Sequence, residues 1–371
     1  MRKRSLIPAT LLLLAFASAP LRARVGDSLP FPLIERFENF GVKDGLPAWK
    51  IHCVLAEGER VWVGTTHGLA VRENGRFRVI GKEQGLSHGV VTSLAIDPAT
   101  GDLWAGTFKG LNRISAGRVD TFTQTSSGLP NDVVYSVLVA KGAVWAATAA
   151  GVGRYDLATR AWSLYDQTNT IMHEPWTYSL AESEDRIWVG VWAGGVVEHD
   201  PVKGTWKEWR DPDGEMEIDL QPDDGPVHDV TSWIATSGNL LWQGSYFGMA
   251  RYDGKSWKTF HKEKTPLPSD FINFIAARGA AAWVCTDQGL SVTDGETWAT
   301  YRAAKEGGGT ITVSRPGRPA ETRRMATALS NDFILGASIT DEGIWLATSH
   351  GLSRGVFARG GNPRETRRST R

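Results

Sequence analysis

The chain has 371 residues, of which 41% are hydrophobic and 22% charged, and its 41 Lys and Arg balance 41 Asp and Glu. This composition excludes a disordered chain, a coiled coil and a multi-span membrane protein, and the missing basic surplus argues against nucleic-acid binding. The 16 Trp and 41 Gly instead indicate many short strands joined by tight turns.

Residues 1–17 are predicted to be a signal peptide. A basic start, Arg2 to Arg4, precedes an apolar run from Leu6 to Ala19, and Ala15-Phe16-Ala17 offers a cleavage site, with cleavage as late as about residue 23 left open. About 14 apolar residues form a helix of roughly 21 Å, too short for a hydrocarbon core of about 30 Å. No later stretch is apolar enough to span a membrane. We therefore expect an exported protein, periplasmic or secreted.

One motif then recurs seven times, as in Val61-Trp62-Val63-Gly64-Thr65 and Leu103-Trp104-Ala105-Gly106-Thr107. A Gly stands six positions after each Trp, which chance does not explain at this Gly content. The repeated Trp residues are Trp62, Trp104, Trp145, Trp188, Trp242, Trp283 and Trp345, and the Gly residues are Gly68, Gly110, Gly151, Gly194, Gly248, Gly289 and Gly351. The motif is thus the unit of the fold.

Each repeat has room for four short strands, the size of one propeller blade. The Trp lies on the second strand, and the Gly closes the hairpin to the third because Gly tolerates positive φ. The fourth strand carries two apolar residues three apart: Phe77/Ile80, Val119/Phe122, Trp162/Tyr165, Trp206/Trp209, Trp257/Phe260 and Trp298/Tyr301. The sequence therefore predicts an all-β, seven-bladed β-propeller with four-stranded blades.

The last repeat lacks a fourth strand, because only a basic tail follows Leu352 to Phe357. A matching apolar pair, Phe37 and Phe40, precedes the first repeat. We expect Leu33 to Phe40 to complete the last blade and close the ring, which hides edges that would otherwise invite aggregation. The propeller would span residues 24–358, and residues 359–371 would be a disordered tail.

The pattern G-L-[PS]-x-x-x-V followed by [LIV]-W-[VLA]-[GA]-T-x-x-G-[LV], as in Gly128-Leu129-Pro130 and Val144-Trp145-Ala146-Ala147-Thr148, resembles the two-component regulator propeller repeat. That repeat occurs in periplasmic sensor regions of bacterial hybrid histidine kinases, and the resemblance covers roughly residues 31 to 358. It implies a sensory propeller. In the family a membrane helix and kinase motifs follow, whereas this sequence stops after the propeller, so we expect no kinase part.

Two long connections distinguish the repeats. Residues 211–224, between repeats four and five, are acidic, and residues 302–328, between repeats six and seven, are Gly-rich and mostly basic. Both join a fourth strand to the next first strand, so we expect both to rise on the face that carries the turns between second and third strands. Such loops often carry binding, and solvated charge is the alternative.

Unusual side chains gather on the same face, at one mouth of the channel. In five repeats an acidic residue stands just before the innermost strand. One position earlier, five repeats have His or Asn. Aromatic, acidic and imidazole groups around a concavity suit a carbohydrate or protein ligand, although Asp and Asn at strand starts also accept backbone N–H groups in turns. The candidate ligand-binding residues are Trp49, His67, His88, Lys109, Asn131, Asp132, His173, Glu174, Trp176, Trp192, His228, Asp229, Tyr246, Phe247, Asp270, Asp332 and His350.

An enzymatic alternative rests on His173-Glu174 and His228-Asp229, which we place at matching positions of adjacent repeats. Imidazole and carboxylate groups meeting near the axis could hold a divalent cation for a lyase or hydrolase. Seven-bladed lyases acting on cyclic peptide antibiotics use a broadly similar arrangement. We favour a monomeric binding protein without a cofactor or chemistry of its own, possessing a sensory or signalling accessory role; the sequence does not identify the ligand.

Overall fold

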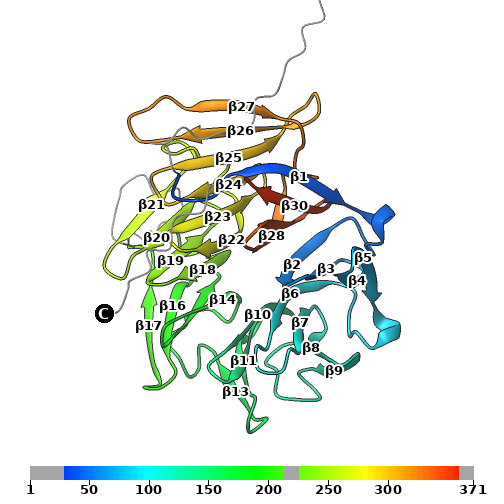
Figure 1. Ribbon diagram of the computed structural model, residues 1–371. Coiled ribbons are helices and arrows are strands. Elements are labelled where there is room, and N and C mark those ends of the chain that lie inside the picture. The colour runs from blue at the N-terminus through cyan, green and yellow to red at the C-terminus, as the bar shows by residue number, and fades with distance from the viewer. Residues whose placement is uncertain (1–28, 213–224, 359–371) are drawn as a thin grey trace, which may run out of the picture.

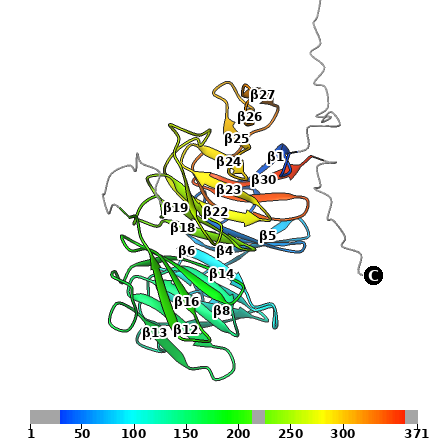
Figure 2. The same cartoon turned by 90° about the vertical axis from the view of Figure 1, so that its left-hand side faces the viewer.

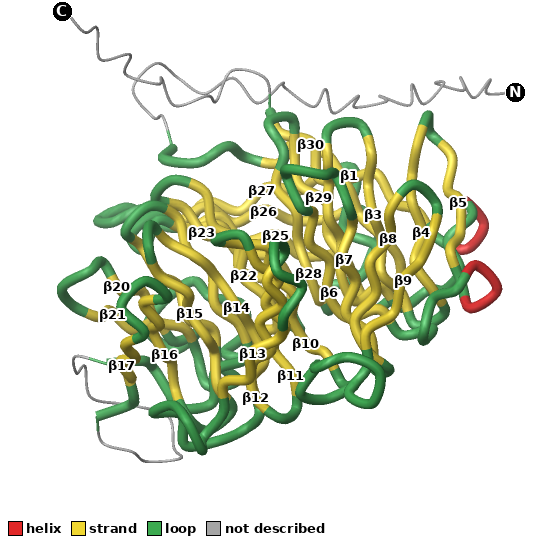
Figure 3. Tube along the Cα trace, turned by 90° about the horizontal axis from the view of Figure 1, so that it is seen from below, coloured by secondary structure: helices red, strands yellow, loops and turns green. Residues whose placement is uncertain are grey.

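The computed structural model describes residues 29–212 and 225–358, which form seven antiparallel sheets arranged as the blades of a ring (Figure 1). The predicted all-β, seven-bladed architecture is confirmed. Besides strands, the described residues contain only two short 3-10 helices, η1 (Val42–Asp44) and η2 (Lys82–Gln84), drawn red in Figure 3. None of the described helices is long and apolar enough to cross a bilayer. The predicted signal peptide, the basic tail and residues 213–224 of the acidic connection lie outside the described residues.

In six blades the strands run outward from the channel in chain order, and in the seventh β1 is the outermost strand, beside β30. The first three blades comprise β2 (Ile51–Glu57), β3 (Arg60–Thr65), β4 (Gly68–Glu73) and β5 (Arg76–Ile80); β6 (Val91–Ile96), β7 (Leu103–Thr107), β8 (Gly110–Ser115) and β9 (Arg118–Phe122); and β10 (Val134–Ala140), β11 (Ala143–Thr148), β12 (Gly151–Asp156) and β13 (Trp162–Tyr165).

The remaining blades comprise β14 (Thr177–Ser183), β15 (Arg186–Val191), β16 (Gly195–Asp200) and β17 (Thr205–Trp209); β18 (Trp233–Ser237), β19 (Leu240–Gly244), β20 (Met249–Tyr252) and β21 (Trp257–Phe260); β22 (Ile272–Arg278), β23 (Ala281–Thr286), β24 (Gly289–Thr293), β25 (Trp298–Ala303), β26 (Gly309–Ser314) and β27 (Glu321–Met325); and β28 (Ile334–Ile339), β29 (Gly343–Thr348), β30 (Gly351–Phe357) and β1 (Ile34–Phe40).

The repeated Trp fills the gap between adjacent blades. Trp104 is fully buried and packs with Val144 and Ala146 of the following blade. Two positions after Trp62 there is no room for a side chain. A Cβ on Gly64 would lie 2.3 Å from Cys53 Sγ and 2.8 Å from Val91 Cγ1 of the next blade. The W-x-G spacing therefore puts a large ring beside a bare backbone on one sheet face, as alternation of side chains requires.

An arginine opposite the Trp is a further repeated feature. In four blades the third-strand residue that pairs with the Trp is Arg. Its guanidinium carbon lies 5.6 to 5.8 Å from the indole centroid. Such cation–π contacts add stability while the aliphatic stem covers the ring. The four arginines are Arg113, Arg154, Arg251 and Arg354.

The hairpin glycine has the predicted role in six repeats, with φ between 93° and 130°. At Gly110 (φ 101°) an added Cβ would lie 2.4 Å from the carbonyl oxygen of Phe122. In the fourth repeat the prediction that Gly194 closes the hairpin is wrong. The turn between β15 and β16 is one residue longer there, and Gly195, with φ 65°, begins β16. Ala193, also at positive φ, takes up the additional residue.

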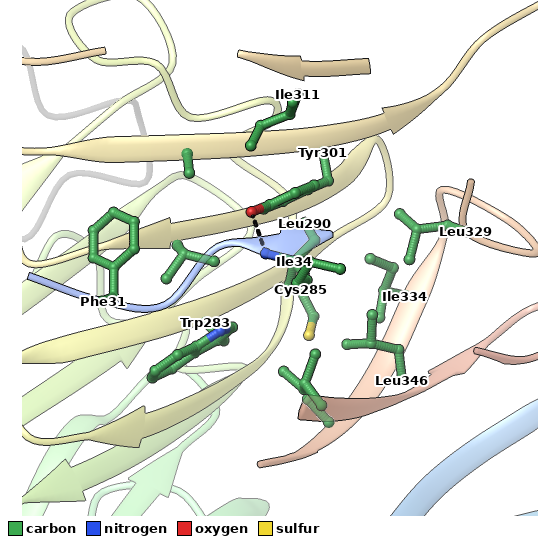
Figure 4. Close-up of a cluster of buried hydrophobic side chains, with 14 of the residues drawn as sticks. Phe31, Ile34, Trp283, Cys285, Leu290, Tyr301, Ile311, Leu329, Ile334 and Leu346 are labelled. Atoms are coloured by element: carbon green, nitrogen blue, oxygen red, sulfur yellow. Dashed lines mark hydrogen bonds between the residues drawn. The ribbon is translucent and has the colours of Figure 1, made fainter. Parts of the chain in front are cut away.

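The ring closes as predicted, because β1 pairs antiparallel with β30 from Ile34↔Phe357 to Phe40↔Leu352. Side chains of the sixth blade and of the segment after it also accept hydrogen bonds from the backbone of β1. The Ile34 N–H donates to the hydroxyl of buried Tyr301 at 2.8 Å (Figure 4), and the Phe37 N–H donates to Thr327 Oγ1 at 2.7 Å. Phe31, Ile34 and Phe37 belong to the apolar cluster shared by the sixth and seventh blades.

The basic connection 302–328 is not the loop that its Gly content suggested. It forms the hairpin β26–β27, which extends the sixth blade to six strands and projects from the ring (Figures 1 and 2). Apolar residues on β26 explain this difference, since Ile311 and Val313 are buried in the same cluster as Ile34. The hairpin therefore lengthens the blade and adds buried residues to the apolar cluster that contains the closing strand.

Candidate functional site

One face of the ring carries the turns between second and third strands together with the connections between blades; we call it the mouth face. A hydrogen bond fixes this arrangement in all seven blades. A Gly at the start of the third strand, or directly before it in the fifth blade, donates its N–H to a carbonyl oxygen of the connection to the next blade, at 2.6 to 2.9 Å. The accepting residues are Gly89, Asp132, Pro175, Asp229, Asp270, Asp332 and Trp49.

Four of the predicted ligand-binding carboxylates have structural partners on this face. Each accepts the backbone N–H of a residue at the end of the fourth strand or just after it, at 2.8 or 2.9 Å. The pairs are Asp132 with Gln124, Asp229 with Asp211, Asp270 with Lys262, and Asp332 with Ala303. These carboxylates join the end of one blade to the start of the next, which favours the turn-forming interpretation of the acidic residues.

The preceding position also forms turns. Asn131, His88 and His228 each accept the backbone N–H of the residue two places later, at 2.8 to 3.0 Å. In both histidines the acceptor is Nδ1, so the neutral ring carries its proton on Nε2. The His228 ring is fully buried and stacks on Phe247 at 4.2 Å between centroids.

The proposed match between His173-Glu174 and His228-Asp229 is wrong by one residue. The hydrogen bond that recurs in every blade ends on Pro175 in the fourth repeat and on Asp229 in the fifth, so Glu174 corresponds to His228. His173 lies 3.2 Å from Glu208, and Asp229 is held by Arg210 at 2.6 Å. No group of three or more His, Cys, Asp or Glu suited to a metal ion occurs within residues 29–212 and 225–358.

All exposed Phe, Trp and Tyr side chains of the described chain lie on the mouth face. They come from five different blades and from two kinds of segment: the residue or two before an innermost strand, and the turn between β7 and β8. Their exposed fractions are 46% for Trp49, 44% for Phe108, 48% for Trp176, 36% for Phe271 and 36% for Phe333. The opposite face carries no exposed Phe, Trp or Tyr among the described residues, so these side chains distinguish the mouth face.

Inside this rim, five rings form a continuous arc across blades three to six. Tyr135 stacks on Tyr178 at 4.5 Å, Trp192 lies 5.3 Å from Tyr178 and 5.7 Å from Tyr246, and Tyr246 stacks on Phe271 at 4.1 Å. Burial, and then the Tyr135 hydroxyl, raise the pKa of Tyr178 to about 12, so its hydroxyl is neutral. Sequence reasoning selected Trp192 and Tyr246 and missed Tyr135 and Tyr178, which stand on innermost strands.

The other half of the mouth face is basic. The rings of Trp49 and His350 stack almost parallel, with centroids 4.6 Å apart, and Lys50, Lys109 and His67 are also exposed there. Below this rim, His52 occupies the bulge in β2, and its buried Nε2 has no hydrogen-bond partner. Burial, assisted by the charge of Lys50, lowers the pKa of His52 to about 4, so the ring is neutral.

Solved structures share this fold. The chain matches the extracellular domain described for the hybrid two-component system BT4673 from B. thetaiotaomicron (TM-score 0.66, 18% identity, 86% of this chain) and that of BT3049 (0.66, 17%, 89%). Virginiamycin B lyase from Staphylococcus aureus matches with a TM-score of 0.58 at 15% identity, over 86% of this chain and 97% of the lyase. The predicted resemblance to sensor propellers is thus confirmed as a likeness of fold.

The chain spans only 40% and 42% of the lengths of the BT4673 and BT3049 domains. No protein-family model matches it, and no curated protein sequence matches it. The comparisons consequently establish a propeller like those of extracellular sensors, and the mouth face is the part of the molecule from which a function can be argued.

Proposed function

We propose that the chain is an exported, sensory-type propeller whose mouth face binds a protein partner. Five exposed aromatic side chains on one face, and none elsewhere among the described residues, carry this proposal. Aromatic residues are enriched at the centres of protein interfaces, where one Trp or Phe can dominate the binding free energy. The predicted signal peptide and the extracellular origin of the BT4673 and BT3049 domains support export.

Hydrogen-bonding capacity favours a protein over a carbohydrate. A sugar presents many hydroxyl groups and therefore needs carboxylate or amide acceptors beside the aromatic rings. Here four mouth-face carboxylates, those of Asp132, Asp229, Asp270 and Asp332, already accept backbone N–H groups. Glu174 stays exposed, but the exposed aromatic side chains together with Lys50 and Lys109 form a surface suited to apolar and acidic side chains of a partner.

The test compares capture of partners by the wild-type protein and a Trp49→Ala/Phe271→Ala variant. Both proteins are immobilised and exposed to periplasmic and surface extracts of the source organism, and recovered proteins are quantified by mass spectrometry. Val202→Ala is the matched control, because Val202 is 86% exposed in the turn between β16 and β17 on the opposite face. We expect a specific partner to be lost with the double variant and retained with the control.

The same proteins should be applied to a glycan array, with Trp192→Ala and Tyr246→Ala added to probe the aromatic arc. Glycan binding that these variants abolish would assign the face to carbohydrate. Partner capture that survives the Trp49→Ala/Phe271→Ala double variant would disprove the proposed protein interface.

A further inference from the structure

A pocket of about 390 Å³ lies between the fourth and fifth blades, on the face opposite the mouth face. The β14–β15 and β18–β19 hairpins and the turn after β20 surround it. Its volume is within the range of small-molecule sites. Gly238 and Gly254 leave its rim open, since an added Cβ at either would have no neighbour within 4 Å.

Aromatic rings form the floor. The ring centroid of Tyr252 lies 4.8 Å from that of Trp209 and 6.5 Å from that of Trp188. The Lys207 ammonium stands 3.5 Å from the centroid of the Trp209 ring. This is the shortest cation–π distance in the described protein, and the remaining ones are 5.1 Å or longer. The pocket therefore already accommodates an ammonium group on an aromatic surface.

The charges around the floor also favour a cation. Glu184, Asp185 and Glu198 line the pocket together with Arg186, which is held by Glu198 at 2.8 Å and by Asp200 at 2.7 Å. Asp200 lies outside the lining and is also paired with Lys203. If the ammonium of Lys207 is set aside, the three lining carboxylates face one lining cation, the guanidinium of Arg186. An organic cation would offset that excess and gain the ring contact at once.

We propose that this pocket binds an organic ammonium ion, and that Lys207 is a resident occupant which the ligand displaces. Lys207 is exposed and its four-carbon stem is flexible, so its ammonium can move to water when a ligand enters. The incoming group lies on Trp209 with the carboxylates of Glu184 and Glu198 around it. The proposal concerns a site separate from the mouth face, so the two stand or fall independently.

The test uses choline, 1,4-diaminobutane and the neutral choline isostere 3,3-dimethylbutan-1-ol, titrated against the full protein by calorimetry and Trp fluorescence. Removing the resident ammonium with Lys207→Met should tighten choline binding about three- to tenfold. Lys258→Met is the matched control: Lys258 holds the same strand position one blade on, lies 5.4 Å from the Phe260 ring and is paired with Glu296. It should leave choline affinity unchanged.

Glu198→Gln should weaken binding of both cations, whereas Trp49→Ala on the mouth face should have no effect. Urea melts identify any variant that fails to fold, and Lys207→Met is informative because damage to the pocket would weaken binding rather than tighten it. Equal or weaker choline binding by Lys207→Met, no measurable binding of either cation, or equal binding of the neutral alcohol would each overturn the proposal.

Discussion

At the scale of single residues, the mouth face shows how one side-chain type can serve either ligand or backbone. Asp132, Asp229, Asp270 and Asp332 stand where a binding site would place its acceptors, and each is used to hold a backbone N–H group of the preceding blade. Their effect should therefore be seen in stability. The aromatic residues beside them have no comparable internal role and remain exposed.

Asp132→Ala should lower the free energy of unfolding by about 1 to 2 kcal/mol, because the Gln124 N–H loses a charged acceptor. Urea denaturation measures this. The control is Asp341→Ala: that carboxylate is 95% exposed and only forms an ion pair with Arg278, so the change should be within about 0.5 kcal/mol. Equal stability of the two variants would contradict the structural role of Asp132.

His52 should make the protein less stable in mild acid. Its pKa is lowered from 6.5 to about 4 in the folded protein, mainly by burial. The unfolded chain therefore takes up a proton at a higher pH than the folded one, so stability falls as the pH drops from about 6.5 to about 4. The loss from this group is at most about 3 kcal/mol.

Urea midpoints measured across that pH range should fall less steeply for His52→Gln than for the wild type. The comparison cancels contributions from other titrating groups, which both proteins share. Parallel curves would show that His52 does not titrate differently on folding.

At the scale of elements, the Trp strand is the feature that builds the ring. Trp104→Ala should cost about 3 to 5 kcal/mol, because it empties a fully buried space between two blades. Trp176→Ala is the control, since Trp176 is 48% exposed on the mouth face and its loss should change stability by less than about 0.5 kcal/mol. Denaturation curves that place the two variants together would refute the interblade role.

Trp and Gly repeat at a fixed spacing in the sequence. Blade number, strand order and ring closure could therefore be predicted. The same spacing could have avoided one error: Pro175, not Glu174, lies 13 positions before its Trp, as Asp132 and Asp229 do. The β26–β27 hairpin could not be predicted from a repeat, because it occurs once and its apolar residues are buried in a cluster shared with the distant β1. The pocket could not be predicted either, since its lining comes from two blades, over residues 183–209 and 238–254.

At the scale of the whole molecule, stability depends on a strand that is remote in sequence from the blade it completes. A protein lacking residues 1–40 should lose the β1–β30 pairing and the Tyr301 hydrogen bond, leaving β30 as an open apolar edge. We expect a lower melting temperature and aggregation, both detectable by light scattering during heating. A synthetic peptide of residues 29–41 should restore the melting temperature, whereas a scrambled peptide should not; unchanged melting of the truncated protein would contradict this role.

The pairing of Ile34 with Phe357, next to the hydrogen bond from the Ala358 N–H to the Leu33 carbonyl, brings both ends of the described chain to one spot on the rim. Tension applied between these ends would load the β1–β30 bonds one after another instead of all together. The ring would then open between β1 and β30 under modest force. The other six blades would bear load only after this pairing had separated, and would stay intact.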